Sequence, residues 1–342
     1  MRWQDDNDWS DAGSVGGESA AQRSARASVA SAMGALTRGA SPTFRFGQFH
    51  VDVARNSSDD FNPLHDPKKW ESVRGNPYGS PVVSVFQMEC LIEYLLRKGQ
   101  GAADSWLIEQ HDLHFCNYQF TFTGWLRPHE EFQVRIHPSS VSPGADHTLS
   151  NRVFLKTEGQ LVVAGSVSQS ASPLYLPNAE FSRLHGLERA ADITYVPDTK
   201  YFLKRKYLST GNAKNFVIAC LADQAYYFDE VEDRVSFPDM VPVSFISSAL
   251  FEKDMADNVD FRQTPMAHAR HNISIDRRLA RDLRSNDRLH LLVTRPKLVP
   301  PAAALGQLQM AAECYDCFGL VQDNQVLFRA QVFLVPLTGG RR

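Results

Sequence analysis

Hydrophobic and polar residues follow one order of elements twice along the chain after residue 41. The first copy opens with the strand-like stretch "TFRFGQFHVDV" and the polar loop "SSDDFNPLHDP". The apolar segment "PVVSVFQMECLIEYLLRKG" comes next, and its helical spacing predicts a mostly buried helix that ends at Gly99. Four strand candidates follow, namely "IEQHDLHFCNYQFTF", "EEFQVRIHP", "HTLSNRVFLKTEG" and "QLVVAGSVSQSA", and the short turn "TEGQ" joins the last two as a hairpin.

The second copy begins near Lys214 with "KNFVIACLADQAYYFDE". A helix candidate, "VPVSFISSALFEKDM", precedes the strand candidates "HARHNISIDRR", "DRLHLLVTRPKL", "LGQLQMAAECYDCFGLV" and "NQVLFRAQVFLVPL". Local matches indicate a true repeat, because "PVVSVF" at Pro81 parallels "VPVSFI" at Val241. In the same way "HDLHF" at His111 parallels "HNISI" at His271, about 160 residues further along the chain.

This order predicts an α+β protein of two fused repeats, each an antiparallel sheet wrapped around a long buried helix. Two such sheets joined edge to edge would also remove two exposed edges. The expected boundaries are a mobile tail over 1–41, a first copy over 42–175, a proline-interrupted linker over 176–213 and a second copy over 214–338. The tail is rich in Ser, Ala, Gly and Asp, and it has no apolar stretch like that of a secretory signal.

Composition narrows the class of protein. Hydrophobic residues make up 43 % and charged residues 22 % of the 342 residues, and the net charge is −3, which is typical of a globular protein in water. Because no basic stripe is present, we expect no nucleic-acid partner. The apolar runs are too short for a membrane span. The five scattered cysteines lack the spacing of a disulfide framework, which favours a reducing compartment, here the cytoplasm.

The motifs predict neither a metal nor an organic cofactor. Cys314 and Cys317 form a lone CxxC in a strand-like run, without the second pair that a zinc site requires. Two pairs of histidines are spaced three residues apart in strand-like runs: His111 with His114, and His268 with His271. We expect each pair to face opposite sides of its strand and therefore to be a poor metal site. No glycine-rich phosphate loop follows a strand.

The polar loop before the first buried helix supports two interpretations. Asp60, Asn62 and Pro63 are common turn formers, and Asp59 or Asp60 could simply cap a helical turn. Alternatively, the loop carries chemistry. Pro63 fixes one φ angle and biases Asn62 toward an extended conformation, so a rigid turn could bring the Asp60 carboxylate and the His65 imidazole to one water.

Asp60, Asn62, Pro63 and His65 match the pattern D-x-N-P-x-H, and here the first copy resembles the MaoC-like (R)-specific enoyl-thioester hydratases, which have the hotdog fold. The helix start "SPVVSVFQMECL" and the hairpin "RVFLKTEGQLVVAGSV" are also similar. The resemblance implies two fused hotdogs, with Asp60 and His65 as a catalytic dyad for reversible hydration of an enoyl thioester. Asn62 and Pro63 would shape the loop. The substrate would be a thioester of coenzyme A or of acyl carrier protein, with no cofactor, and a second copy of the chain, forming a homodimer, is a further candidate partner.

One departure from the family lies at the start of the buried helix. Active members usually carry a His-Gly pair there, and this chain has Ser84 and Val85. The resemblance implies that the Val85 amide still points at the thioester carbonyl, but a branched side chain makes close approach less easy. Two alternatives therefore stay open: other thioester chemistry, such as hydrolysis or decarboxylation, and acyl-thioester binding without catalysis.

The second copy lacks the loop motif. The acid-rich stretch "DQAYYFDEVEDRVSFPDMVPVSF" stands in its place, and we expect this copy to complete the sheet and to shape an acyl tunnel. The basic cluster "KYFLKRKY", from Lys200 to Tyr207, is either surface charge without a ligand or a contact for a coenzyme A phosphate or an acidic carrier protein.

Overall fold

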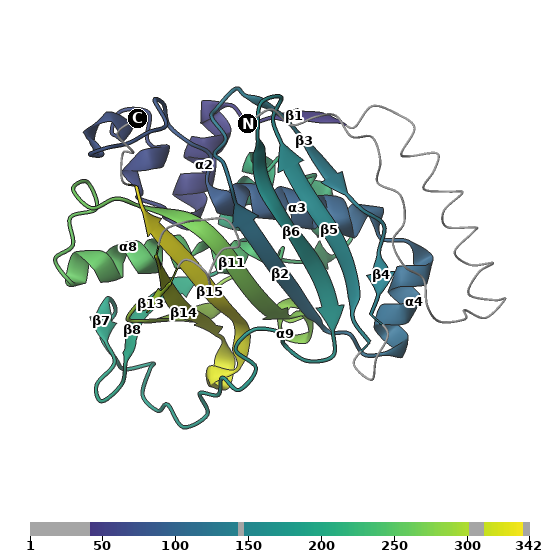
Figure 1. Cartoon of the computed structure of the whole chain (residues 1–342). Coiled ribbons are helices and arrows are strands. Elements are labelled where there is room, and N and C mark those ends of the chain that lie inside the picture. Colours follow the sequence, from purple (N-terminus) through teal and green to yellow (C-terminus); the bar gives the residue numbers. More distant parts are fainter. Residues whose placement is uncertain (1–41, 143–146, 301–310, 338–342) are drawn as a thin grey trace. The chain divides into compact units, whose positions relative to one another are not determined.

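The structure is a computed structural model that describes residues 42–142, 147–300 and 311–337, so the tail predicted over 1–41 lies outside the described residues. The first half of the described chain begins with one short strand, continues with helices and ends with a run of antiparallel strands (Figure 1). Its helices are α2 (Gln48–Ser58), the 3-10 turns η1 (Pro63–His65) and η2 (Trp70–Ser72), α3 (Val85–Gly99) and α4 (Ala102–Gln110). Its strands are β1 (Thr43–Arg45), β2 (Phe115–Phe122), β3 (Glu131–Ile136), β4 (Ser140–Val141), β5 (Leu149–Lys156) and β6 (Leu161–Ser170).

The buried helix predicted in this half is confirmed as α3, which ends at Gly99. Its residues are buried without a break from Phe86 to Tyr94, including Gln87, Glu89 and Glu93, because the core surrounds it on every side. The predicted hairpin is confirmed as well, since β5 and β6 pair antiparallel.

Two strand predictions in this half are too long. The strand expected from Thr43 ends at Arg45, and helix α2 follows it. Gly47 precedes this helix, and its amide N–H donates to Nδ1 of His50 at 3.0 Å, which ties down the first turn. The strand expected from Ile108 begins only at Phe115, because α4 extends to Gln110 and a turn separates it from the strand.

The second half repeats the same order of elements. Its helices are α5 (Thr210–Ala219), α6 (Gln224–Tyr227), α7 (Met240–Ser244), α8 (Ile246–Ala256), α9 (Arg277–Arg281) and the 3-10 turn η3 (Gln322–Asn324). Its strands are β7 (Thr194–Tyr195), β8 (Tyr201–Tyr207), β9 (Phe228–Asp229), β10 (Arg234–Val235), β11 (Met266–Asp276), β12 (Arg288–Thr294), β13 (Lys297–Val299), β14 (Ala312–Leu320) and β15 (Val326–Pro336).

Strands β7 and β8 lie within the stretch 176–213 that the sequence predicted as a linker. Because β8 pairs with β12 along its length, this stretch is part of the second sheet as well as a connection.

The two halves share one sheet, as predicted. Its order is β1-β3-β5-β6-β2-β11-β15-β14-β12-β8-β7, and β2 pairs antiparallel with β11 at the junction. Outward from that junction the order of one half mirrors the order of the other, so that β6 matches β15, β5 matches β14 and β3 matches β12. The edge of each sheet that would otherwise be open at the junction is thereby paired with the other half.

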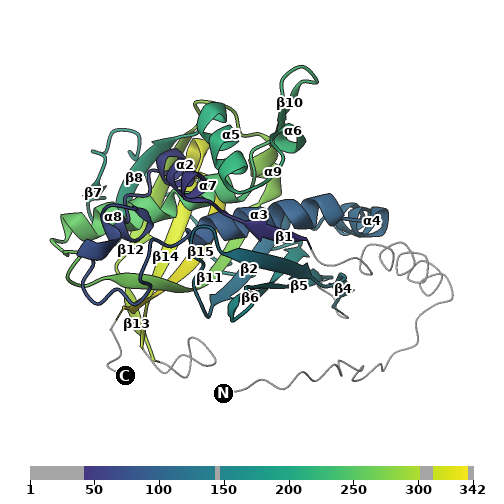
Figure 2. The ribbon, with the colours of Figure 1, turned by 90° about the horizontal axis from the view of Figure 1, so that it is seen from above.

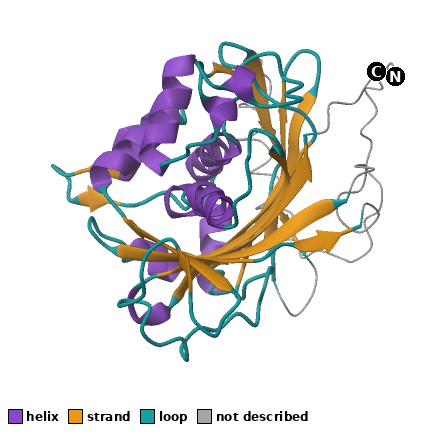
Figure 3. Ribbon diagram, turned by 90° about the vertical axis from the view of Figure 1, so that its left-hand side faces the viewer, coloured by secondary structure: helices purple, strands orange, loops and turns teal. Residues whose placement is uncertain are grey.

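The helices lie against one face of this sheet. Figure 3 shows the strands curving round them, and Figure 2 shows α3 beside the sheet with α2, α5 and α7 beyond it. Equivalent helices of the two copies meet, because α2 packs on α5 and α3 packs on α7. One hydrophobic core therefore contains residues of both halves, such as Phe86, Tyr118 and Val332. Within the described ranges, no helix combines the length and apolarity needed to cross a bilayer.

Candidate functional site

The loop after α2 is a rigid turn built by its own side chains. Asp60 Oδ1 accepts the backbone N–H of Asn62 at 3.1 Å, and Asn62 Oδ1 accepts the N–H of Leu64 at 2.9 Å. The second bond caps η1, whose first residue is Pro63. The same residues therefore form the turn and fix the positions of Asp60 and His65 on it.

Asp60 and His65 face each other across this turn. Nε2 of His65 lies 3.6 Å from Oδ2 of Asp60, and the two residues are only 8 % and 5 % exposed. Nδ1 of His65 lies 2.7 Å from the carbonyl oxygen of Val82. Because a carbonyl can only accept, Nδ1 carries a hydrogen, and Nε2 is the ring nitrogen that faces the site. Nε2 therefore lies toward the Asp60 carboxyl group.

The start of α3 lies against the same loop. The N–H of Val82 donates to the carbonyl of Leu64 at 3.0 Å, so the strand-like segment before the helix is tied to η1. Ser84 is the N-cap, although its side chain makes no capping bond, and Val85 is the first residue of the helix. None of the described residues accepts a hydrogen bond from the Val85 amide. The amide is therefore a free donor at the positive end of a buried helix.

Two histidines of the second half, His268 and His271, complete this region, and the prediction that they face opposite sides of their strand is wrong. Nδ1 of His268 lies 2.8 Å from Nε2 of His271, so the two rings meet on one side of β11. The pairing of β11 with β15 shifts between His268 and Arg270, which makes Ala269 the extra residue of a β-bulge. The bulge reverses the alternation of side chains along the strand. His268 and His271 therefore lie on the same side of β11 and not on opposite sides. The local sequence carries no signal for it, because the register is set by a distant strand.

His271 in turn contacts the buried helix. Its Nδ1 lies 2.8 Å from Oε1 of Glu89, and both side chains are fully buried. Phe86 stacks on the His271 ring at 5.0 Å and meets the His268 ring edge-on at 5.8 Å. Since Phe86 follows Val85 directly, the histidine pair lies beside the start of α3.

Burial controls the charge of these groups. Desolvation raises the pKa of Glu89 well above its usual value and lowers the pKa of His271 to about 3. The pKa of His268 is also lowered well below its usual value, by desolvation and by His271. Asp60 and His65 also act electrostatically on His268, so the four side chains belong to one electrostatic environment.

Comparison with known proteins identifies the fold. No family model matches the chain, and no curated protein is similar to it in sequence. Among solved structures, a MaoC-like dehydratase superposes with a TM-score of 0.54 at 10 % identity, covering 86 % of this chain and 95 % of that one. A protein described as a MaoC domain dehydratase, from Chloroflexus aurantiacus J-10-fl, gives 0.54 at 8 % identity, with 86 % and 93 % covered. Rv0216 of Mycobacterium tuberculosis, which has a double hotdog fold, gives 0.50 at 12 % identity, with 86 % and 94 % covered.

The chain has the double hotdog fold. The predicted fold class is thereby confirmed, and so is the predicted likeness to MaoC-like proteins at the level of the fold. At identities of this size the likeness concerns the path of the chain, and the roles of individual residues depend on the geometry of this double hotdog itself.

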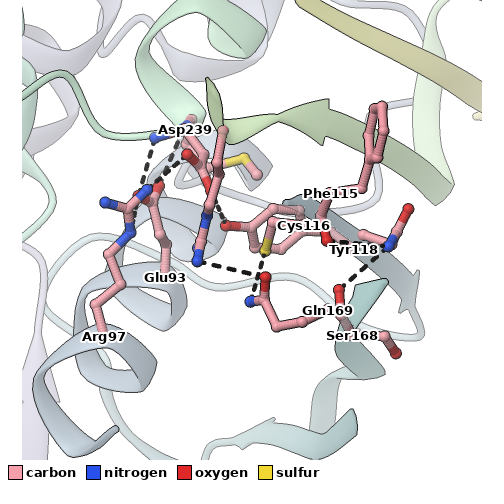
Figure 4. Close-up of polar contacts among 11 residues, drawn as sticks. Glu93, Arg97, Phe115, Cys116, Tyr118, Ser168, Gln169 and Asp239 are labelled. Carbon is pink, nitrogen blue, oxygen red and sulfur yellow. Dashed lines mark hydrogen bonds and ion pairs between the residues drawn. The ribbon is translucent and has the colours of Figure 1, made fainter. Parts of the chain in front are cut away.

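In the second hotdog a buried charge network lies at the start of α7. Asp239 is fully buried, and its carboxylate accepts from Arg97 Nη2 at 2.6 Å and from the Tyr118 hydroxyl at 2.7 Å (Figure 4). Nε and Nη2 of Arg277 each donate to it at 3.1 Å. Glu93 accepts the backbone N–H of Asp239 at 2.9 Å, which caps the helix from outside. Where the first hotdog has the loop from Asp60 to His65, the second therefore has paired charges that link both halves.

Burial and the contacts of this network shift the pKa values of its two carboxyl groups, Asp239 and Glu93. Burial alone would raise the pKa of Asp239, but Arg277 and Arg97 hold it below its usual value. Burial raises the pKa of Glu93 to about 7, although Arg97 opposes this rise. Among the acids of the stretch that replaces the loop motif, Asp239 is thus committed to a structural ion network.

Two lysines of the basic cluster in β8 form ion pairs with acidic side chains of the protein itself. Nζ of Lys204 lies 2.9 Å from Glu252 Oε2, and Nζ of Lys206 lies 2.6 Å from Asp59 Oδ2. Arg205 donates to two backbone carbonyls. The central cations of the cluster are therefore engaged, and a phosphate contact there would have to displace these partners. The Lys206 contact also has a structural effect, because it braces the residue next to Asp60 from the second hotdog.

The CxxC cysteines offer poor metal ligands. Cys314 and Cys317 lie in β14, three residues apart, and burial raises the pKa of Cys314 to about 11 and that of Cys317 well above its usual value. Metal binding requires the thiolate, which burial disfavours at both positions. In the described parts of the chain, no group of three or more His, Cys, Asp or Glu residues is arranged to hold a metal ion.

Proposed function

We propose that this double hotdog adds water to an enoyl thioester, or removes it from a 3-hydroxyacyl thioester, at the site around Asp60 and His65. The observation that carries the proposal is the position of Nε2 of His65, which faces the Asp60 carboxyl group at 3.6 Å beside the free amide of Val85. The structural likeness to MaoC-like dehydratases supports the same class of reaction.

Hydration needs a base, a hydrogen-bond donor that stabilises the negative charge developing on the thioester oxygen, and a proton donor. A separation of 3.6 Å is too long for a direct hydrogen bond, but one water can contact both Asp60 and His65. Nε2 of His65 takes a proton from that water, and the water oxygen bonds to the β-carbon of the enoyl group. The Asp60 carboxylate orients the water and stabilises the imidazolium that forms. The amide of Val85 donates to the thioester oxygen, on which the enolate charge develops.

Ser84 and Val85 favour an alternative that uses the same site. The valine side chain stands where a glycine would leave room for the thioester carbonyl, so binding without hydration, or hydrolysis of the thioester, remains the competing function. In either case the acyl group is carried as a thioester of coenzyme A or of acyl carrier protein.

The test is to incubate the chain with crotonyl and longer enoyl thioesters. Hydration bleaches the conjugated absorbance, hydrolysis releases a thiol, and a binding protein does neither. Asp60→Asn and His65→Gln should each lower hydration by about 10²–10⁴-fold with little change in melting temperature. His185→Gln, at an exposed position, is the matched control and should hydrate like wild type. Wild-type rates in both site variants would move the chemistry away from this loop.

A further inference from the structure

A hydrogen-bonded row leads from the protein core toward the proposed site. It runs from Oε1 of Glu89 to Nδ1 of His271 at 2.8 Å, and from Nε2 of His271 to Nδ1 of His268 at 2.8 Å. Glu89 and His271 are fully buried, whereas His268 is partly exposed. No described residue bonds to Nε2 of His268, the outer end of the row.

We propose that Glu89, His271 and His268 form a proton relay that delivers a proton to the α-carbon of the thioester bound at Asp60 and His65. The inference rests on the proposed function and assigns the proton donor that hydration needs. His268 would be the group that meets the substrate, and His271 and Glu89 would act through it.

The row allows two arrangements of its hydrogens. In the first, the Glu89 hydroxyl donates to Nδ1 of His271, Nε2–H of His271 donates to Nδ1 of His268, and His268 presents Nε2–H. In the second, Glu89 is a carboxylate, both histidines carry hydrogen on Nδ1, and His268 presents a bare Nε2. The distances suit both, because each contact needs one hydrogen and one lone pair. The arrangements differ by the loss of one proton from the outer end.

The surroundings of Glu89 favour the first arrangement at rest. Oε2 of Glu89 is buried, and no described residue hydrogen-bonds to it. A carboxylate there would leave part of its charge without a partner, which is costly in a low dielectric. The raised pKa of Glu89 and the lowered pKa of His271 agree with a neutral row. Phe86 and Phe122 pack on the His271 ring, and Asp60 and His65 are the titratable groups outside the row that act on His268.

The step balances in protons and charge. The Nε2–H bond of His268 breaks as the C–H bond at the α-carbon forms, and the electron pair of the enolate makes that bond. Nδ1 of His268 takes the hydrogen of His271, Nδ1 of His271 takes the hydrogen of Glu89, and Glu89 becomes a carboxylate. Since His65 has gained a proton from the attacking water, one proton must return from His65 to the relay. Water entering after product release can carry it.

The test compares Glu89→Gln and His271→Gln with wild type under saturating enoyl thioester. Gln at 89 keeps the size of the side chain and a donor for His271, but it cannot release a proton. We expect kcat to fall by about 10²-fold in both variants, with KM nearly unchanged. The rate in mixtures of light and heavy water should indicate several moving protons in wild type and fewer in the variants. Glu93→Gln, a buried carboxyl one turn further along α3, is the control: it should lower the melting temperature and leave kcat of the folded protein unchanged.

The outcomes separate this inference from the proposed function. If wild type hydrates, Asp60→Asn does not, and Glu89→Gln keeps full kcat, the relay is overturned and the function stands. If wild type does not hydrate enoyl thioesters, the function and the delivery step fall together. Nitrogen-15 NMR of the histidines then decides whether the row itself exists. Both rings neutral with hydrogen on Nε2 would support it, and a charged ring or hydrogen on Nδ1 of His271 at neutral pH would refute it.

Discussion

Replacing Asp239 by asparagine tests how strongly the buried network links the two hotdogs. Asparagine keeps the size of the side chain and its bond from Tyr118, but it removes the charge that faces Arg97 and Arg277. Two guanidinium groups then face the single carboxyl of Glu93 in the core. Removing one partner of a buried ion pair costs about 3–5 kcal/mol, because the remaining charge loses its compensation. For a chain of this size that corresponds to a fall of about 10 °C in melting temperature.

The assay is thermal unfolding followed by circular dichroism, together with urea unfolding at neutral pH. Glu230→Gln is the matched control, since it breaks an exposed ion pair with Lys214, and it should leave the melting temperature unchanged. The double variant Asp239→Asn with Arg277→Met removes one charge of each sign, so it should recover part of the loss. A melting temperature for Asp239→Asn equal to that of wild type, or no recovery in the double variant, would refute this account of the network.

Three further predictions use separate features. Val85→Gly should raise turnover on a simple enoyl thioester, because it clears the approach to the helix amide, at a cost of about 0.5–1 kcal/mol in unfolding free energy; unchanged turnover would place the carbonyl donor elsewhere. A truncation after Ser172 should be insoluble or should dimerise, because it exposes the edge of β2 that pairs with β11; a soluble monomer would contradict this. Burial, with Arg205 and Arg288, lowers the pKa of His290 from 6.5 to about 4. The unfolded chain therefore binds this proton first, and stability falls as pH drops through that window. His290→Gln should reduce that loss, measured as the urea midpoint at about pH 7 and about pH 5; an equal loss in both proteins would count against it.

The parts of the fold that follow from local pattern were predictable. The helix α3 is mostly apolar, and the repeat places matching stretches about 160 residues apart along the chain. The turn from Asp60 to His65 was also predictable, because its bonds join residues at most a few positions apart. Helix α2 was missed since "FRFGQFHVDV" alternates like a strand, and only the turn at Gly47 separates the two elements.

The contacts that complete the candidate site depend on residues far apart in sequence. The bulge at Ala269 arises where β11 pairs with β15, so the spacing of His268 and His271 gave the wrong face. Likewise the sequence around Lys206 is typical of a charged surface, but Lys206 is buried and donates to Asp59, a residue of the other half. Such contacts depend on how the two copies join, and residue spacing within one copy carries no information about that.

The pairing of β2 with β11 has a consequence for the protein in solution. It brings His268 of one half to the Asp60 loop of the other within a single covalent chain. When two separate subunits form a shared site, dilution separates them, whereas linked halves meet at an effective concentration set by the connection alone. Any activity of this site per chain should therefore stay constant as the protein is diluted. The two halves are also always made in equal amounts, so one of them is free to lose its own loop motif and serve only the other.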